Sequence, residues 1–320
     1  MDSAHMDAAR HRTLRLGTRG SPLALAQTRA VLARLRAAAP GLAAEEQVIA
    51  TTGDRVQDRP LAEIGGKGLF AKEIHEALGD GRIDAAVHSL KDLETALPPG
   101  IVLAAALPRE DARDALILGP EAPSPDPADP LAALPRGAVI GTSSVRRQAQ
   151  LLHARPDLRV ALLRGNVQTR LNRLRAGDMA ATLLALAGLR RLGLEAAASV
   201  VLEPEIMLPA ACQGIVGVTA RADDAPVLAL LASLADPAAT LAASAERALL
   251  GELDGSCRTP IGAHARPLAD GSLHLTGLVA RADGSFLLRR SLAGPAGEAA
   301  ALGRELGRLL RADSPRDLFA

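Results

Sequence analysis

Apolar and polar positions along the chain form short blocks that predict strands alternating with helices. Residues 14–16 are a first strand candidate, and Ser21-Pro22 then opens an alanine- and leucine-rich helix that runs to about Ala38. Serine caps a helix N-terminus and proline suits the first helical turn, so this start signal is strong. The alternation continues with strands at 47–50, 83–87 and 101–107 and a helix at 68–78. Such alternation favours a mainly parallel sheet.

A proline-rich stretch separates this pattern from a second one. Six of the 21 prolines lie between Gly119 and Gly137, which predicts an exposed loop. After the loop, apolar strands at 139–140, 159–163 and 181–185 again alternate with helices. We assign a further apolar run, at 215–218, to the first sheet.

From about Pro237 onward the pattern of predicted helices and strands changes. A helix at 241–250, a hairpin of strands 273–280 and 286–292, and a helix at 298–310 predict a small α+β domain. A chain of 320 residues is long for a single core. We therefore expect an α/β protein of three domains, which comprise residues 14–107 plus 214–233, residues 113–208, and residues 238–320.

Composition narrows the range of partners. The formal net charge is only +1, and Trp and Tyr are absent, so the chain lacks the positive field and the stacking platforms of nucleic-acid binders. The first dozen residues hold no apolar signal-peptide core, and no run of about 18 uncharged apolar residues occurs. We expect a soluble, cytoplasmic and monomeric protein. Seven histidines and two cysteines, Cys212 and Cys257, show no metal-ligand spacing, so no metal is expected.

The sharpest chemical signal is Lys91-Asp92, which follows the apolar run 83–87. Only three of the 37 cationic residues are lysines, and all three lie in the stretch from position 67 to position 91. A compact ammonium differs chemically from a planar guanidinium, so lysine in an arginine-rich chain indicates a specific role. The end of a parallel strand is a usual place for a site in an open α/β sheet. A solvated surface ion pair is the alternative.

Arginines gather at the expected carboxyl ends of the second group of strands. They are Arg146, Arg147, Arg164, Arg170 and Arg191. Arg146 and Arg147 fall in the first turn of a helix, where their charge opposes the helix dipole unless an anion lies beside them. Arg19 and Ser21 also stand beside a helix start. Each arginine alone is more often a solvated surface residue, but five at one end of a sheet favour a polyanion site.

Nucleotide-binding motifs are incomplete in this chain. The run Gly65-Gly66-Lys67-Gly68 has Leu61 where a P-loop needs glycine, and Gly68 where it needs serine or threonine. No Gly-x-Gly-x-x-Gly follows the first strand. A nucleotide-dependent transferase is therefore a weak hypothesis.

Seven segments in order resemble the porphobilinogen deaminase family, whose members are also called hydroxymethylbilane synthases. They are Arg15-Leu-Gly-Thr-Arg-Gly-Ser-Pro-Leu-Ala-Leu, Gly65-Gly-Lys-Gly-Leu-Phe, Ala86-Val-His-Ser-Leu-Lys-Asp, Gly141-Thr-Ser-Ser-Val-Arg-Arg, Leu163-Arg-Gly-Asn-Val, Ala187-Gly-Leu-Arg-Arg-Leu-Gly and Gly255-Ser-Cys. Any one segment is a weak signal, but seven in family order over about residues 14–265 are highly specific.

The resemblance implies an enzyme of tetrapyrrole synthesis with two βα domains like type II periplasmic binding proteins and a C-terminal domain. Cys257 would hold a dipyrromethane cofactor through a thioether. Four porphobilinogen molecules would be added to it head to tail, with release of ammonia and finally of hydroxymethylbilane. By matching position, the catalytic residue would be Asp92, the cofactor would be held by Lys91, Ser144, Arg146 and Arg147, and the substrate acids by Arg19, Ser21, Arg164, Arg170 and Arg191.

Two positions depart from the family pattern. Cys212 stands where relatives usually have glycine, and Glu94 stands where relatives often have proline, two residues after the catalytic aspartate. The rival class is a non-enzymatic anion-binding module of periplasmic type. The presence of Gly255-Ser-Cys257 counts against that class.

Overall fold

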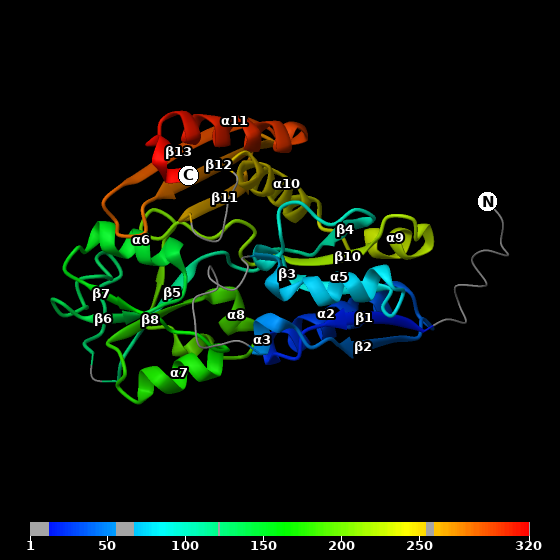
Figure 1. Ribbon diagram of the computed structural model, residues 1–320, viewed down its shortest axis with the longest axis horizontal. Coiled ribbons are helices and arrows are strands. Elements are labelled where there is room, and N and C mark those ends of the chain that lie inside the picture. Colours follow the sequence, from blue (N-terminus) through cyan, green and yellow to red (C-terminus); the bar gives the residue numbers. More distant parts are fainter. Residues whose placement is uncertain (1–12, 56–66, 121, 254–258, 320) are drawn as a thin grey trace. The chain divides into compact units, whose positions relative to one another are not determined.

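The computed structural model describes residues 13–55, 67–120, 122–253 and 259–319. They form two compact units (Figure 1). Unit 1 contains the described residues up to position 109 together with 215–240, and unit 2 contains the described residues of 110–214 and 241–319. Both units combine sheets with helices, so the expected α/β class is confirmed.

A five-stranded mixed sheet forms the centre of unit 1, in the order β2-β1-β3-β10-β4. Its strands are β1 (Leu14–Thr18), β2 (Ala44–Val48), β3 (Ala85–Ser89), β4 (Ile101–Ala106) and β10 (Val216–Arg221). β1 pairs in parallel with β2 and β3, whereas β10 is antiparallel to β3 and β4. The assignment of 215–218 to the first sheet is confirmed. The expected parallel direction holds for the other four strands, and β10 opposes them.

Helices of unit 1 follow the apolar pattern with one difference. α2 (Pro22–Ala38) begins where the sequence predicts, because Ser21 Oγ accepts a hydrogen bond from the Ala24 amide at 3.3 Å. The expected helix at 68–78 is instead a 3-10 turn, η1 (Lys67–Phe70), followed by α5 (Lys72–Gly79). Two shorter helices are α3 (Thr52–Arg55) and α9 (Ala225–Ala232). The apolar face of α2 packs on β1, β2 and β3.

The first sheet of unit 2 has the strand order β7-β6-β8-β5-β9. Its strand directions follow the same pattern as those in the sheet of unit 1. Its strands are β5 (Asp114–Leu118), β6 (Val139–Gly141), β7 (Arg159–Ala161), β8 (Ala181–Ala185) and β9 (Val200–Leu202), and its helices are α6 (Val145–Ala154), α7 (Val167–Arg175) and α8 (Leu186–Arg191). β6 is parallel to β7 and β8, whereas β5 is antiparallel to β8 and β9. In each sheet, therefore, one reversed strand lies between two strands of the common direction. The sequence pattern did not predict β5 or β9.

The C-terminal part of unit 2 is a three-stranded antiparallel sheet with helices α10 and α11. Its elements are α10 (Pro237–Glu252), β11 (Ile261–Pro267), β12 (Ser272–Ala280), β13 (Leu287–Pro295) and α11 (Ala299–Ala312). The predicted hairpin and terminal helix are confirmed, while β11 adds a third strand. α11 crosses α10 closely at Gly303, where a Cβ would lie 2.1 Å from the carbonyl oxygen of Ala245. Only glycine allows this approach of the two helices.

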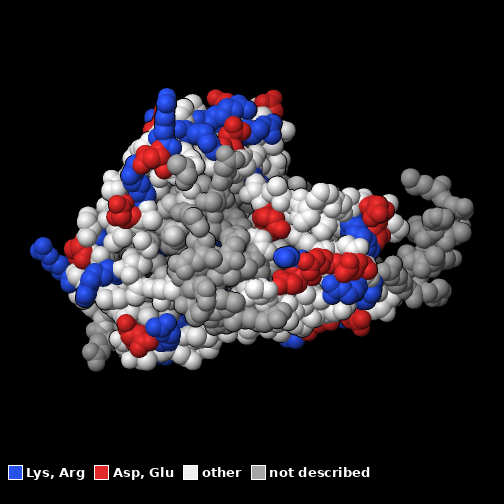
Figure 2. All heavy atoms as spheres, in the orientation of Figure 1, with Lys and Arg blue, Asp and Glu red and all other residues white. Residues whose placement is uncertain are grey.

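Charge on the surface is mixed. The face drawn in Figure 2 carries acidic and basic side chains interspersed, in keeping with the formal net charge of +1. Within the described ranges no single helix is long and apolar enough to cross a membrane, although the bent pair α9 and α10 passes that test of length and composition together.

Candidate active site

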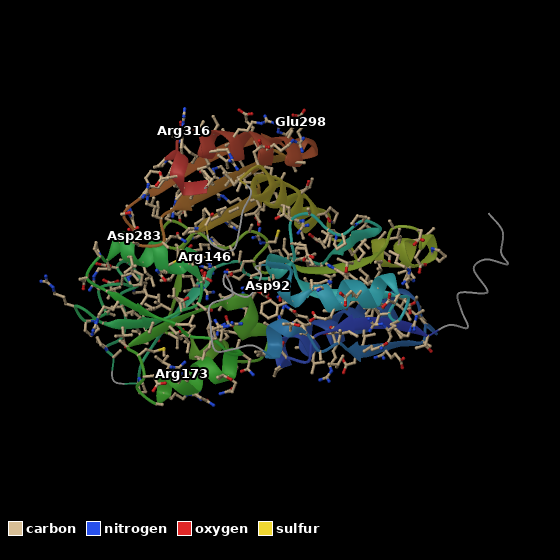
Figure 3. All side chains as sticks on the ribbon, in the orientation of Figure 1. Asp92, Arg146, Arg173, Asp283, Glu298 and Arg316 are labelled. Atoms are coloured by element: carbon tan, nitrogen blue, oxygen red, sulfur yellow. The ribbon has the colours of Figure 1, made fainter. Side chains whose placement is uncertain are left out.

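Asp92 and its neighbour Lys91 lie in a single 3-10 turn, η2 (Leu90–Asp92), directly after β3 (Figure 3). The turn is fixed by apolar neighbours on both sides, because Leu90 and Leu93 are buried. The Leu90 amide also donates to the carbonyl oxygen of Ile215 at 3.0 Å. Lys91 and Asp92 themselves are partly exposed. The predicted position of this charged pair at the end of a buried strand is confirmed.

Arg19 and Ser21 follow β1, the parallel neighbour of β3, so they lie at the same edge of the sheet as the η2 turn. The Arg19 guanidinium lies 4.0 Å from the centre of the Phe70 ring, a cation–π distance. Phe70 in turn packs on Gly53, where a Cβ would lie 2.4 Å from the ring. Ser21 acts in the structure as the cap of α2.

Arg146 and Arg147 are buried, each only 5% exposed, and both contact the fully buried Asp114 at the start of β5. Nη2 of each arginine donates to one Asp114 oxygen at 2.8 Å. Their Nη1 groups donate to the carbonyl oxygens of Leu208 and Leu183, at 2.6 and 2.8 Å. The sequence argument expected an anion beside these two arginines, and the structure supplies one from the chain itself.

Asp114 was not predicted as a site residue from the sequence. Burial alone would raise its pKa, but the charges of Arg146 and Arg147 outweigh burial and hold the pKa below its ordinary value. Gln213 Nε2 adds a third hydrogen bond to the carboxylate, at 2.7 Å. The only local signal for Asp114 was an acidic residue before the apolar run Ala115–Leu118, and that signal does not reveal partners more than 30 residues away.

The arginine pair carries more positive charge than its partner neutralises. Two guanidiniums face one carboxylate, and Nε of both Arg146 and Arg147 is buried without a hydrogen-bond partner among the residues that the structure describes. Ser144 lies beside them as the cap of α6, where its Oγ accepts from the Arg147 amide at 3.4 Å. Such a surplus of buried donors and charge suits an anionic ligand.

Arg164, Arg170 and Arg191 are partly buried and lie in the same unit as the arginine pair. Arg164 follows β7, and Arg170 lies in α7 with its Nε donating to the Gly165 carbonyl at 2.9 Å. Arg191 ends α8, and its Nη2 donates to the Gly214 carbonyl at 2.6 Å. Because β6, β7 and β8 are parallel, the segments after them begin at one edge of the sheet. The sequence-predicted residues are thus grouped by unit, at the carboxyl edge of each sheet.

Of the two cysteines, only Cys212 lies among the described residues. Cys257 lies outside the described residues. Cys212 is buried and has a positive φ of 62°, the only non-glycine residue with a positive φ among those described. Its amide donates to the buried carboxylate of Glu246, which also accepts from the Ala265 amide at 2.6 Å. The departure from glycine thus falls on a backbone conformation that glycine adopts more easily.

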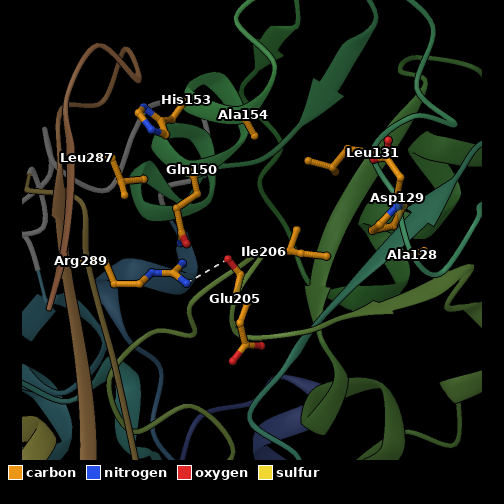
Figure 4. Close-up of a pocket in the computed structure, with 11 residues that line it drawn as sticks. Ala128, Asp129, Leu131, Gln150, His153, Ala154, Glu205, Ile206, Leu287 and Arg289 are labelled. Atoms are coloured by element: carbon orange, nitrogen blue, oxygen red, sulfur yellow. Dashed lines mark hydrogen bonds between the residues drawn. The ribbon is translucent and has the colours of Figure 1, made fainter. Parts of the chain in front are cut away.

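A cavity of about 370 Å³ lies in unit 2 (Figure 4). Its lining comes from Ala128–Leu131, from α6, from Glu205 and Ile206, and from β13. Arg289 Nη1 donates to the Glu205 carbonyl at 2.9 Å across the cavity wall. None of the sequence-predicted site residues lines it.

Comparison with known proteins matches nearly the whole chain. The family model "Porphobilinogen deaminase, dipyromethane cofactor binding domain" matches residues 14–229, and "Porphobilinogen deaminase, C-terminal domain" matches residues 240–312. The chain is 50% identical over 309 residues to porphobilinogen deaminase of Paracoccus denitrificans, with 96% of each chain covered. It is also 50% identical over 286 residues to the chloroplastic enzyme of Oryza sativa, with 88% of this chain and 78% of that one covered.

Among solved structures, the BvgS VFT2 domain of Bordetella pertussis is similar with a TM-score of 0.43 and 13% identity. The match covers 73% of this chain and 91% of that domain.

Proposed function

Because this chain belongs to the porphobilinogen deaminase family, we propose how its residues divide the work of the family's reaction. The enzyme acts in tetrapyrrole biosynthesis by polymerising porphobilinogen, and its larger matched region is a dipyrromethane cofactor-binding domain. The family membership favours this activity over a non-enzymatic anion-binding module and over a nucleotide-dependent transferase.

Catalysis is assigned to Asp92. The observation that carries this assignment is a partly exposed carboxylate that is held at the carboxyl end of β3 by two buried leucines and stands next to Lys91. A carboxylate there stabilises the positive charge that develops on the substrate pyrrole as ammonia leaves, and it accepts hydrogen bonds from pyrrole N–H groups. It also takes part in proton transfer at the reacting carbons.

The cofactor is assigned to Lys91, Ser144, Arg146 and Arg147, with a thioether to Cys257. When bound, a dipyrromethane supplies the pyrrole to which the first substrate molecule is joined. Its acetates and propionates are anions, and the surplus positive charge around Asp114 supports their binding by the arginine pair. Intact-mass measurement and peptide mapping test the thioether, because they should find two linked pyrrole units on the Cys257 peptide and none on the Cys212 peptide.

Substrate acids are assigned to Arg19, Ser21, Arg164, Arg170 and Arg191. Guanidiniums bind carboxylates through two parallel hydrogen bonds, which suits the acetate and propionate of each added pyrrole. We further propose a cytoplasmic monomer. Sedimentation equilibrium of the purified protein would test the oligomeric state.

The experiment that tests the central assignment is Asp92→Asn. The variant should fold and carry the cofactor mass but lose nearly all ammonia release, because an amide cannot stabilise a developing cation as a carboxylate does. The expected loss is several orders of magnitude in rate, about 4 kcal/mol or more of transition-state stabilisation. Near wild-type release of ammonia would refute the role.

A further inference from the structure

Four polar side chains from separate segments lie in a row inside unit 1, and no sequence motif predicted this arrangement. Thr219 of β10 lies at one end, where its Oγ1 is 3.0 Å from Nε2 of the buried His88 on β3. The His88 ring lies 5.9 Å, centre to centre, from the ring of the buried His75 on α5. Nδ1 of His75 is 3.1 Å from Oε1 of Glu94, two residues beyond Asp92.

Burial and neighbouring groups together determine the charge of two members of this series. Burial, and next the charge of His75, lower the pKa of His88 to about 3, so His88 is neutral at neutral pH. Burial alone would raise the pKa of Glu94, but the neighbouring His75 outweighs burial, and the pKa is lowered. Glu94 is therefore ionised at neutral pH. The His75 ring thus lies between the neutral ring of His88 and the carboxylate anion of Glu94. Of these two neighbours, Glu94 is the one whose contact stabilises the His75 ring.

The Glu94 carboxylate also faces the η1 turn. A methyl group at Gly68 would lie 3.7 Å from Oε1 of Glu94, an ordinary van der Waals contact. η1 ends at Phe70, the residue on which Arg19 stacks. Glu94 therefore contacts α5 through His75 and lies near the turn that bears the aromatic ring beside Arg19.

Asp92 is held from both sides along the chain. Upstream, the Leu90 amide donates to the carbonyl of Ile215, the residue before β10. Downstream, the buried Leu93 leads directly to Glu94, whose carboxylate meets His75. Since a reacting group displaced by about 1 Å can lose about a hundredfold in rate, the precision of this downstream tether matters to catalysis.

We propose that Glu94 and His75 form a positioning pair that fixes the Asp92 turn for catalysis. Neither side chain has to touch substrate, since the pair acts through the backbone of η2 and Leu93. This inference rests on the proposed catalytic role of Asp92.

The test is a double-mutant cycle with Glu94→Gln, His75→Gln and both together, beside Glu76→Gln as the control. Glu76 lies one residue after His75 but on the exposed face of α5. Each single variant should lower kcat about tenfold while KM changes by less than about twofold, and the double variant should be no slower than the slower single variant. Glu94→Asp should restore part of the lost kcat. Glu76→Gln should match wild type.

Several outcomes would overturn the proposal. Wild-type kcat in Glu94→Gln, a loss only in thermal stability, or a double variant whose loss equals the product of the single losses would each exclude a positioning pair. Measuring Asp92→Asn in parallel distinguishes a failure of this proposal from a failure of the catalytic assignment of Asp92, on which it rests. An inactive Asp92→Asn with a fully active Glu94→Gln refutes positioning alone, whereas an active Asp92→Asn refutes the catalytic assignment itself.

Discussion

Replacing Asp114 by asparagine tests the structural reading of the arginine pair most directly. The carboxylate is fully buried and accepts three hydrogen bonds, from Arg146 and Arg147 at 2.8 Å and from Gln213 at 2.7 Å. Asparagine keeps the shape but removes the negative charge. One of its two terminal groups becomes an N–H donor, which would then face a guanidinium that has only donors.

The magnitude follows from this geometry. Hydrogen bonds to a charged partner contribute about 1.5–3 kcal/mol each, and removing one partner of a buried ion pair costs about 3–5 kcal/mol. Two buried guanidiniums would remain near one another without a counter-charge. We therefore expect Asp114→Asn to lower the free energy of unfolding by about 3–5 kcal/mol, a large fraction of the 5–15 kcal/mol that is typical of domains.

Urea unfolding at pH 7 measures this difference, with Asp178→Asn as the matched control. Asp178 makes a single ion pair with Arg173 at 2.9 Å on the surface, which should be worth about 0–1 kcal/mol. The wild-type advantage should also narrow at low pH. Because the folded pKa of Asp114 lies below the unfolded value of about 4, its stabilisation is present above pH 4 and is lost as the pH falls through the folded pKa. A deficit within about 1 kcal/mol of the control would refute the reasoning.

Arg147→Leu separates the structural role of the pair from its proposed ligand role. The variant leaves Arg146 and Asp114 as a balanced pair, so it should lose less stability than Asp114→Asn. It also removes the surplus positive charge, so the cofactor mass on the purified protein should fall sharply. A protein that keeps the full cofactor mass would argue against binding of cofactor acids by this arginine.

Three further outcomes follow from single contacts. Arg170→Leu should keep the cofactor mass but slow substrate addition, which single-turnover ammonia release would show, and loss of the cofactor would contradict its assignment to substrate. Cys212→Gly should be active and within about 1 kcal/mol of wild type, because relief at φ 62° is offset by the greater freedom of glycine in the unfolded chain; a melting temperature several degrees lower would contradict this. His88, with its folded pKa lowered to about 3, should make stability fall as the pH drops from about 6.5 toward 3, since the unfolded chain binds the proton first. His88→Gln should flatten that slope, and an unchanged slope would mean that His88 is not the group responsible.

Local sequence signals determined much of the fold and the place of Asp92 at the end of a strand. The Ser21-Pro22 start of α2 follows from cap chemistry within four residues, and the place of Asp92 follows from a buried strand directly before it. β10 was also assigned to its sheet correctly. These features depend on neighbours along the chain or on an apolar run long enough to be recognised as a strand. Both are visible in the sequence.

Tertiary structure decided the partners. β5 runs antiparallel to β8 and β9, and neither this direction nor the strand order that the two sheets share can be derived from residue periodicity. Asp114 meets Arg146 across 32 residues of chain, and Thr219 meets His88 across 131. The sequence shows that a charge lies at a strand end. Whether that charge is neutralised depends on residues that only folding brings near. Coulombic and desolvation energies depend on distance in space, and they determine which of the clustered arginines remain available to a ligand.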